Sequence, residues 1–138
     1  MRYLTRPFVL GALGRRKGVE QFVGPINLAG VRGIRWVAVW PWQDGYNVSV
    51  HDVQDLDDEH RRDLSVFPPL DPEDQDDTGY GHVIGHAQDP AEALELAERD
   101  FGASPDRWVN DGVAGEDYAD FVVARRAPHR FRKVRLEY

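Results

Sequence analysis

The side chains that could carry out covalent chemistry are few in this sequence. It contains no cysteine, and its serines, Ser49, Ser65 and Ser104, lie outside any GxSxG motif of the kind that presents a nucleophilic serine. Ser49 and His51 fall on one face of the same predicted strand, and we expect their side chains to lie roughly 6–7 Å apart, beyond hydrogen-bond reach. No nucleotide-binding fingerprint is present. The sequence therefore favours a protein without catalysis and without a cofactor.

Two groups of residues suggest metal binding, but both have the wrong spacing. His82 and His86 lie in a segment with the pattern of a strand, where four residues span roughly 13 Å, too far for both imidazoles to hold one ion. Residues 74–79 match the first half of a calcium-binding EF-hand loop, but Gly85 stands where that loop needs a bidentate glutamate. We therefore predict no metal site and interpret the two histidines as structural.

Charge is distributed unevenly along the chain. Residues 52–77 hold 11 acidic and two basic side chains, and residues 125–138 carry a net charge of +5. The net charge of the full chain is −7. A solvated acidic loop is the simpler interpretation, and a surface for a basic partner is the functional one. The predicted partner-binding residues combine tryptophans with acids of this segment: Trp36, Trp40, Trp42, Asp55, Asp57, Asp58, Asp74, Asp76 and Asp77.

These side chains are positioned by a predicted β-hairpin over residues 34–53. Its two apolar runs flank Asp44-Gly45, a pair typical of two-residue hairpin loops. This loop pairs Trp42 with Asn47 and Trp40 with Ser49. Side chains alternate between the two faces of a strand. One face of the hairpin is apolar and carries Val37, Val39, Pro41, Tyr46, Val48 and Val50. The other face carries Trp36, Ala38, Trp40 and Trp42 on the first strand, and opposite them Val53, His51, Ser49 and Asn47 on the second. The tryptophan face is either a second core layer or a half-exposed platform for a partner.

Two helices are expected to accompany the hairpin. Asp89 and Pro90 form the start signal of a helix over residues 90–101. A second helix is predicted over 116–126, with acids in its first turn, arginines in its last, and Pro128 ending it. Short strands are predicted over 1–10, 19–23, 65–67 and 81–88, and a surface turn over 11–18. The fold class is therefore α+β, an antiparallel sheet with two helices mainly on one face.

Length and composition favour one domain, residues 1–128, followed by a basic tail or edge strand over 129–138. The chain has 138 residues and is 41% hydrophobic, which supports a packed core. No run is long enough to span a membrane and no signal-peptide core is present, so we expect a cytoplasmic protein. Arginine greatly outnumbers lysine, which suggests a GC-rich bacterial genome.

Three functional hypotheses follow. The first is a non-catalytic interaction protein, such as an immunity- or antitoxin-like inhibitor, that binds a basic partner through the acidic segment and the tryptophan face. The alternative is a small-ligand-binding or hydrolytic domain with a pocket beside that face, in which His51 and an aspartate from 52–58 would exchange protons. The third is weak nucleic-acid association through Arg125–Arg135, which the net negative charge of the chain disfavours.

Overall fold

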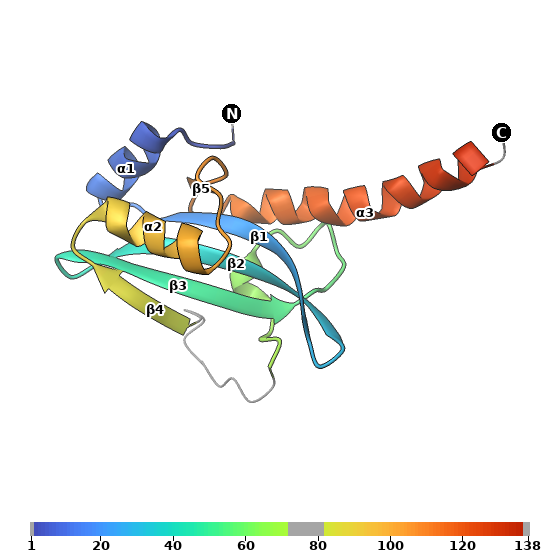
Figure 1. Cartoon of the computed structure of the whole chain (residues 1–138), viewed down its shortest axis with the longest axis horizontal. Coiled ribbons are helices and arrows are strands. Elements are labelled where there is room, and N and C mark those ends of the chain that lie inside the picture. The colour runs from blue at the N-terminus through green and yellow to red at the C-terminus, as the bar shows by residue number, and fades with distance from the viewer. Residues whose placement is uncertain (1, 72–81, 137–138) are drawn as a thin grey trace.

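The computed structural model describes residues 2–71 and 82–136, with side chains up to residue 126. It contains a five-stranded antiparallel sheet in the order β4-β3-β2-β1-β5 (Figure 1). The α+β class is confirmed, with the β2–β3 hairpin in the middle of the sheet. The elements, in chain order, are α1 (Arg6–Gly14), β1 (Val19–Leu28), β2 (Val31–Trp42), β3 (Gly45–Gln54), η1 (Leu64–Val66), β4 (His82–Ala87), α2 (Pro90–Asp100), β5 (Val109–Asn110) and α3 (Ala114–Leu136).

Both faces of the central hairpin are apolar, and each face has its own helical layer. Figure 1 shows α1 and α2 together over the sheet, where they pack on the face that carries Val37. The first turns of α3 pack on the other face, against Ile34. The two helices predicted at 90–101 and 116–126 therefore lie on opposite faces rather than on one. The reason is that Ile34 and its neighbours make the second face too apolar to leave uncovered.

The loop of the hairpin is displaced by one residue from its predicted position. It consists of Gln43-Asp44, and Gly45 already pairs with Trp42 in the ladder. Gly45 permits close approach instead, because a Cβ at this position would lie 2.5 Å from the carbonyl oxygen of Ala87 on β4. Packing of a neighbouring strand, which local turn preferences do not include, thus decides where the chain reverses.

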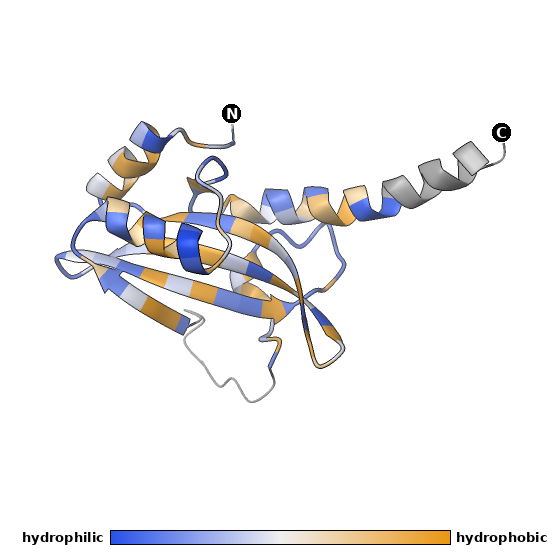
Figure 2. Cartoon of the chain, viewed as in Figure 1, coloured by the Kyte–Doolittle hydropathy of each residue, from blue (hydrophilic) through white to orange (hydrophobic). Residues whose placement is uncertain are grey.

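The new loop shifts the strand register by two residues but leaves the predicted faces unchanged. Trp40 pairs with Asn47 instead of Ser49, and Trp36 pairs with His51 instead of Val53. Side chains alternate with a period of two, so a two-residue shift changes the partners and keeps the faces. Figure 2 shows this alternation of apolar and polar residues along β2 and β3.

The segment predicted as a strand over residues 1–10 is wrong, because Arg6–Gly14 form α1. Val9, Ala12 and Leu13 recur at helical spacing, and all three are buried against the sheet and α2. This spacing is the signal of an amphipathic helix. The glycines at 11 and 14, which indicated a surface turn, are tolerated in a helix whose apolar stripe is buried.

The C-terminal helix is longer than predicted. α3 continues through Pro128 to Leu136, so residues 129–136 extend a helix and the predicted edge strand at these residues is wrong (Figure 1). Proline removes one main-chain hydrogen bond from a helix, which here does not end it. The edges of the sheet are occupied by β4 and β5.

The remaining predictions mostly agree with the structure. The strands at 19–23 and 81–88 are present as β1 and β4, and α2 begins at Pro90, with Asp89 accepting a hydrogen bond from the main-chain N–H of Ala91. Residues 65–67 are an exception, since the segment belongs to the 3-10 turn η1 rather than to a strand. None of the helices in the described part of the chain is long and apolar enough to cross a membrane.

Candidate functional site

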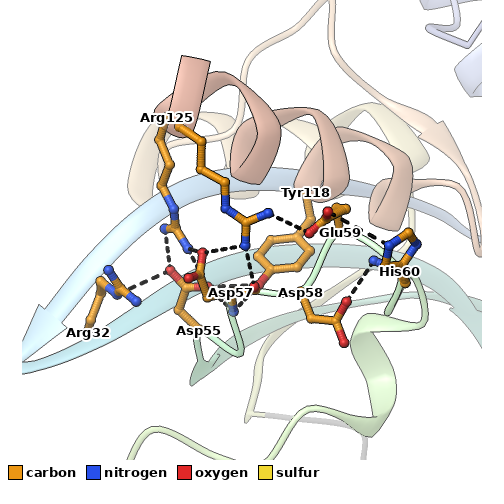
Figure 3. Close-up of polar contacts among 9 residues, drawn as sticks. Arg32, Asp55, Asp57, Asp58, Glu59, His60, Tyr118 and Arg125 are labelled. Atoms are coloured by element: carbon orange, nitrogen blue, oxygen red, sulfur yellow. Dashed lines mark hydrogen bonds and ion pairs between the residues drawn. The ribbon is translucent and has the colours of Figure 1, made fainter. Parts of the chain in front are cut away.

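Within the acidic segment that was predicted to bind a partner, three carboxylates between residues 55 and 59 are bound within the molecule by α3. The side chain of Asp55 is fully buried and accepts hydrogen bonds from Arg125 Nη1 at 2.5 Å and from the Tyr118 hydroxyl at 2.7 Å (Figure 3). Burial alone would raise the pKa of Asp55, but these hydrogen bonds outweigh it, so the pKa lies below its ordinary value. Asp55 therefore holds α3 against the loop after β3.

The neighbouring acids of this segment also have internal partners. Asp57 pairs with Arg125, and Glu59 accepts a 2.8 Å hydrogen bond from Arg126 (Figure 3). Asp58 lies 3.5 Å from Arg61. The acidic charge of residues 55–59 is thus largely compensated by arginines. Asp74, Asp76 and Asp77 and the EF-hand-like run 74–79 lie outside the described residues.

The three tryptophans of the predicted face differ greatly in exposure. Trp36 is 6% exposed and its ring stacks on His51, with centroids 3.8 Å apart and an angle of 12° between the planes. Trp40 is half-buried and meets Trp42 edge to face. Trp42 is 50% exposed. The face is therefore neither a closed core layer nor a flat exposed platform, since it runs from a buried to an exposed end.

Ser49 and His51 lie within hydrogen-bond reach, which corrects the predicted separation. Ser49 Oγ is 2.9 Å from His51 Nε2, and Trp40 Nε1 donates a hydrogen bond to Ser49 Oγ at 3.3 Å. The prediction considered only the spacing of alternate residues along a strand. The stacking of His51 on Trp36, which the two-residue register shift makes possible, orients the imidazole toward the serine.

A cavity of about 580 Å³ opens on this face. β2 and β3 form its floor, the start of β1 forms one wall, and the η1 segment and the β5–α3 turn contribute Ser65 and Asp111. Its polar and aromatic lining residues are Glu20, Trp36, Trp40, Ser49, His51, Ser65 and Asp111. A smaller adjoining cavity of about 90 Å³ shares Glu20, Trp36 and Asp111 and adds Arg62 and Asp63.

Glu20 and Asp111 form a carboxyl pair that sequence reasoning missed. Glu20 is 6% exposed, and its Oε2 accepts a 3.0 Å hydrogen bond from the Ala114 main-chain N–H at the start of α3. Desolvation by burial, reinforced by a hydrogen bond with Asp111, raises the pKa of Glu20 to about 7. Alternation along β1 places Glu20 beside Ala38 on the tryptophan face. That alternation was visible in the sequence, but the position of β1 next to β2 was not.

The histidines considered as metal ligands have separate surroundings. His86 Nδ1 lies 2.7 Å from Asn47 Oδ1, within hydrogen-bond distance. Among residues 2–71 and 82–136, no group of three histidine or carboxylate side chains is placed to hold an ion. Of the basic stretch Arg125–Arg135, Arg125 and Arg126 are paired with the acids described above.

Comparisons with models of protein families, with curated proteins and with solved structures find no match for this chain. The functional proposal therefore rests on the geometry of the site.

Proposed function

We propose that this chain binds a small ligand in the cavity on its tryptophan face. The observation that supports this most directly is the cavity itself, whose volume of about 580 Å³ falls in the range of small-molecule sites. Its lining also has the composition of such sites, a mainly apolar and aromatic surface with a few convergent polar groups. The raised pKa of Glu20 adds the kind of perturbed titratable group that clusters at functional sites.

Binding is better supported than hydrolysis. The pair of Ser49 and His51 has the separation of a nucleophile and its base. Ser49, however, has no exposed surface, and its hydroxyl is already engaged by both Trp40 and His51. A substrate could reach Ser49 Oγ only if the side chains that bury it moved. The serine and histidine are therefore proposed to shape the cavity floor.

The test compares two neighbouring tryptophans. Trp40 lines the cavity and Trp42 does not, although both are on β2 and Trp42 is the more exposed. A fragment library should be screened by ligand-detected NMR against the wild type, Trp40→Ala and Trp42→Ala. We expect fragments that bind the wild type to lose about tenfold or more in affinity for Trp40→Ala. Binding to Trp42→Ala should change by less than about twofold.

Far-UV and near-UV circular dichroism of both variants provide the folding control. If the wild type binds no fragment, or if the two substitutions weaken binding equally, the cavity is not the binding site.

An interaction with a protein partner is the second candidate, and the exposure of Trp42 is the observation in its favour, because tryptophan is enriched at binding hot spots. In this version the chain is an immunity- or antitoxin-like inhibitor of a basic protein. Asp55 and Asp57 would act only by holding α3 in place, because their carboxylates are paired internally. The partner surface would then consist of Trp42, Asp58 and the acids at 74, 76 and 77.

Charge reversal at Asp58, Asp74, Asp76 and Asp77 tests this candidate without breaking the contacts of Asp55. Binding to a panel of basic proteins, nucleases included, should be measured at low and physiological salt. Binding that is lost in the reversed variant and weakened by salt would support the interaction function. Binding whose affinity changes neither with charge reversal nor with salt would reject the interaction function.

A further inference from the structure

The lining of the large cavity is acidic. Glu20 and Asp111 contribute carboxyl groups, and no lysine or arginine borders this cavity among the described residues. Of the described residues that line it, His51 alone can become cationic. Arg62 borders the adjoining small cavity, where Asp63 accompanies it. A ligand in the large cavity therefore meets negative charge and aromatic surface together.

The two carboxyl groups are held close together, which is costly unless a positive charge or a proton lies between them. Glu20 is buried, lines both cavities together with Asp111, and accepts a main-chain hydrogen bond from Ala114. Like charges this close favour one shared proton. An ammonium group can replace that proton because it brings several donors and a full positive charge.

Trp36 points independently to a ligand site. Its side chain is nine-tenths buried and borders both cavities, yet its Nε1–H has no hydrogen-bond acceptor among the described residues. A buried donor without an acceptor costs about 1–3 kcal/mol relative to a paired one. A ligand that carries an acceptor atom would satisfy it.

We propose that the ligand of this cavity is a small organic amine, bound as its cation between Glu20 and Asp111, that also carries an oxygen acceptor for Trp36 Nε1. This inference rests on the proposed small-ligand function and specifies the ligand class. Trp40 completes the match, because the indole ring is the aromatic surface that cations prefer.

Cation binding should be linked to proton release. The amine takes the place of the proton on the carboxyl pair, so affinity rises with pH up to the region of about 7 where Glu20 titrates. The other groups that face Glu20 are Asp111, the Arg62 and Asp63 side chains before η1, and His51 on β3. A positive charge on His51 would also oppose cation binding, so the variant Glu20→Gln is needed to isolate the carboxyl pair.

The experiment uses 2-amino-1-phenylethanol as the probe, with 1-phenylethanol as its neutral match and mandelate as its anionic match. Isothermal titration calorimetry on the full chain should give an affinity for the amine at least about tenfold above that for the neutral alcohol. Mandelate should bind more weakly than either. Titrations in two buffers of different ionisation enthalpy should show proton release near pH 6.5 that Glu20→Gln abolishes.

Asp100→Asn is the matched control, because it removes one carboxylate from an exposed position on α2, where Asp100 contacts Arg99. Glu20→Gln and Asp111→Asn should each weaken amine binding about tenfold, and Asp100→Asn should leave it unchanged. Equal binding of the amine and the neutral alcohol would overturn the cation inference while leaving the small-ligand function standing. The cation inference would also be overturned if the wild type bound other fragments but no amine. The small-ligand function is tested separately, by the fragment screen.

Discussion

Glu20 shows how a single residue couples the stability of this fold to its cavity. Its carboxyl group sits under the start of α3, where main-chain N–H groups of Gly112 and Ala114 donate to it. These donors favour the charged form, but desolvation and Asp111 favour the neutral form more strongly, so the pKa rises from 4.5 to about 7. At neutral pH the residue is divided between two protonation states, either of which a ligand can select.

The raised pKa predicts a pH dependence of stability. The folded chain holds this proton more tightly than the unfolded chain, so stability from Glu20 is fully present below pH 4.5 and is lost as the pH rises to about 7. Urea unfolding should be compared at pH 5 and pH 8 for the wild type and Glu20→Gln. The variant should gain on the order of 2 kcal/mol relative to the wild type over this interval. A stability difference that stays constant with pH would show that Glu20 titrates normally.

At the scale of elements, α3 is attached to the sheet through two kinds of contact. Tyr118 and Val122 are fully buried in the core on the tryptophan face, and Tyr118 also reaches Asp55 through its hydroxyl. Arg125, one turn after Phe121, closes the contact by pairing with Asp55 and Asp57. The contact of the helix with the body of the molecule thus includes an ion pair in which the carboxylate side chain, that of Asp55, has no exposed surface.

Arg125 and Arg126 are adjacent and provide a matched pair of substitutions. Arg125→Ala leaves the buried Asp55 carboxylate with Tyr118 and with Arg32, which lies 3.6 Å away, so we expect a loss of about 2–4 kcal/mol in urea unfolding at pH 7. Arg126→Ala removes an exposed, solvent-screened pair with Glu59 and should cost much less stability than Arg125→Ala.

The lowered pKa of Asp55 gives this prediction a second readout. Stability from the Asp55 pairing is present above the ordinary pKa of an aspartate and is lost as the pH falls through the lowered pKa. The difference between wild type and Arg125→Ala should therefore shrink in acid. Equal losses for the two arginine substitutions at neutral pH would contradict the buried-pair description.

The whole molecule is organised as two hydrophobic cores on opposite faces of one sheet. Leu94 of α2 is fully buried in the first core and Val122 of α3 in the second. β2 contributes to both, with Val37 and Val39 on one side and Ile34 and Trp36 on the other. Because the same strands contribute to both cores, both cores are lost when the sheet unfolds.

This arrangement predicts one cooperative unfolding transition. Leu94→Ala should cost about 2–5 kcal/mol and Val122→Ala about 1–3 kcal/mol, and their effects should add because the sheet separates them. Val123→Ala is the control, since Val123 is 51% exposed beside Val122 and should change little. Unfolding followed by tryptophan fluorescence and by far-UV circular dichroism should coincide. Two separated transitions would mean that the cores unfold independently.

Features of the fold that depend on near neighbours could be predicted from the amino-acid pattern. The alternation of β2 and β3 predicted which residues share a face, and the Asp89-Pro90 pair predicted the start of α2. Both signals are local, since strand periodicity and helix capping involve residues a few positions apart. The same reasoning failed for α1, where a helical spacing of buried residues was outweighed by glycines.

Features that bring distant residues together depend on how the elements pack in the folded molecule. The approach of β4 to Gly45 set the register that stacks His51 on Trp36 and brings it to Ser49. The placement of β1 and of the β5–α3 turn joined Glu20 to Asp111. The docking of α3 turned Asp55 from an expected surface charge into a buried one. Each depends on contacts between elements far apart in the chain, and no local pattern encodes those contacts.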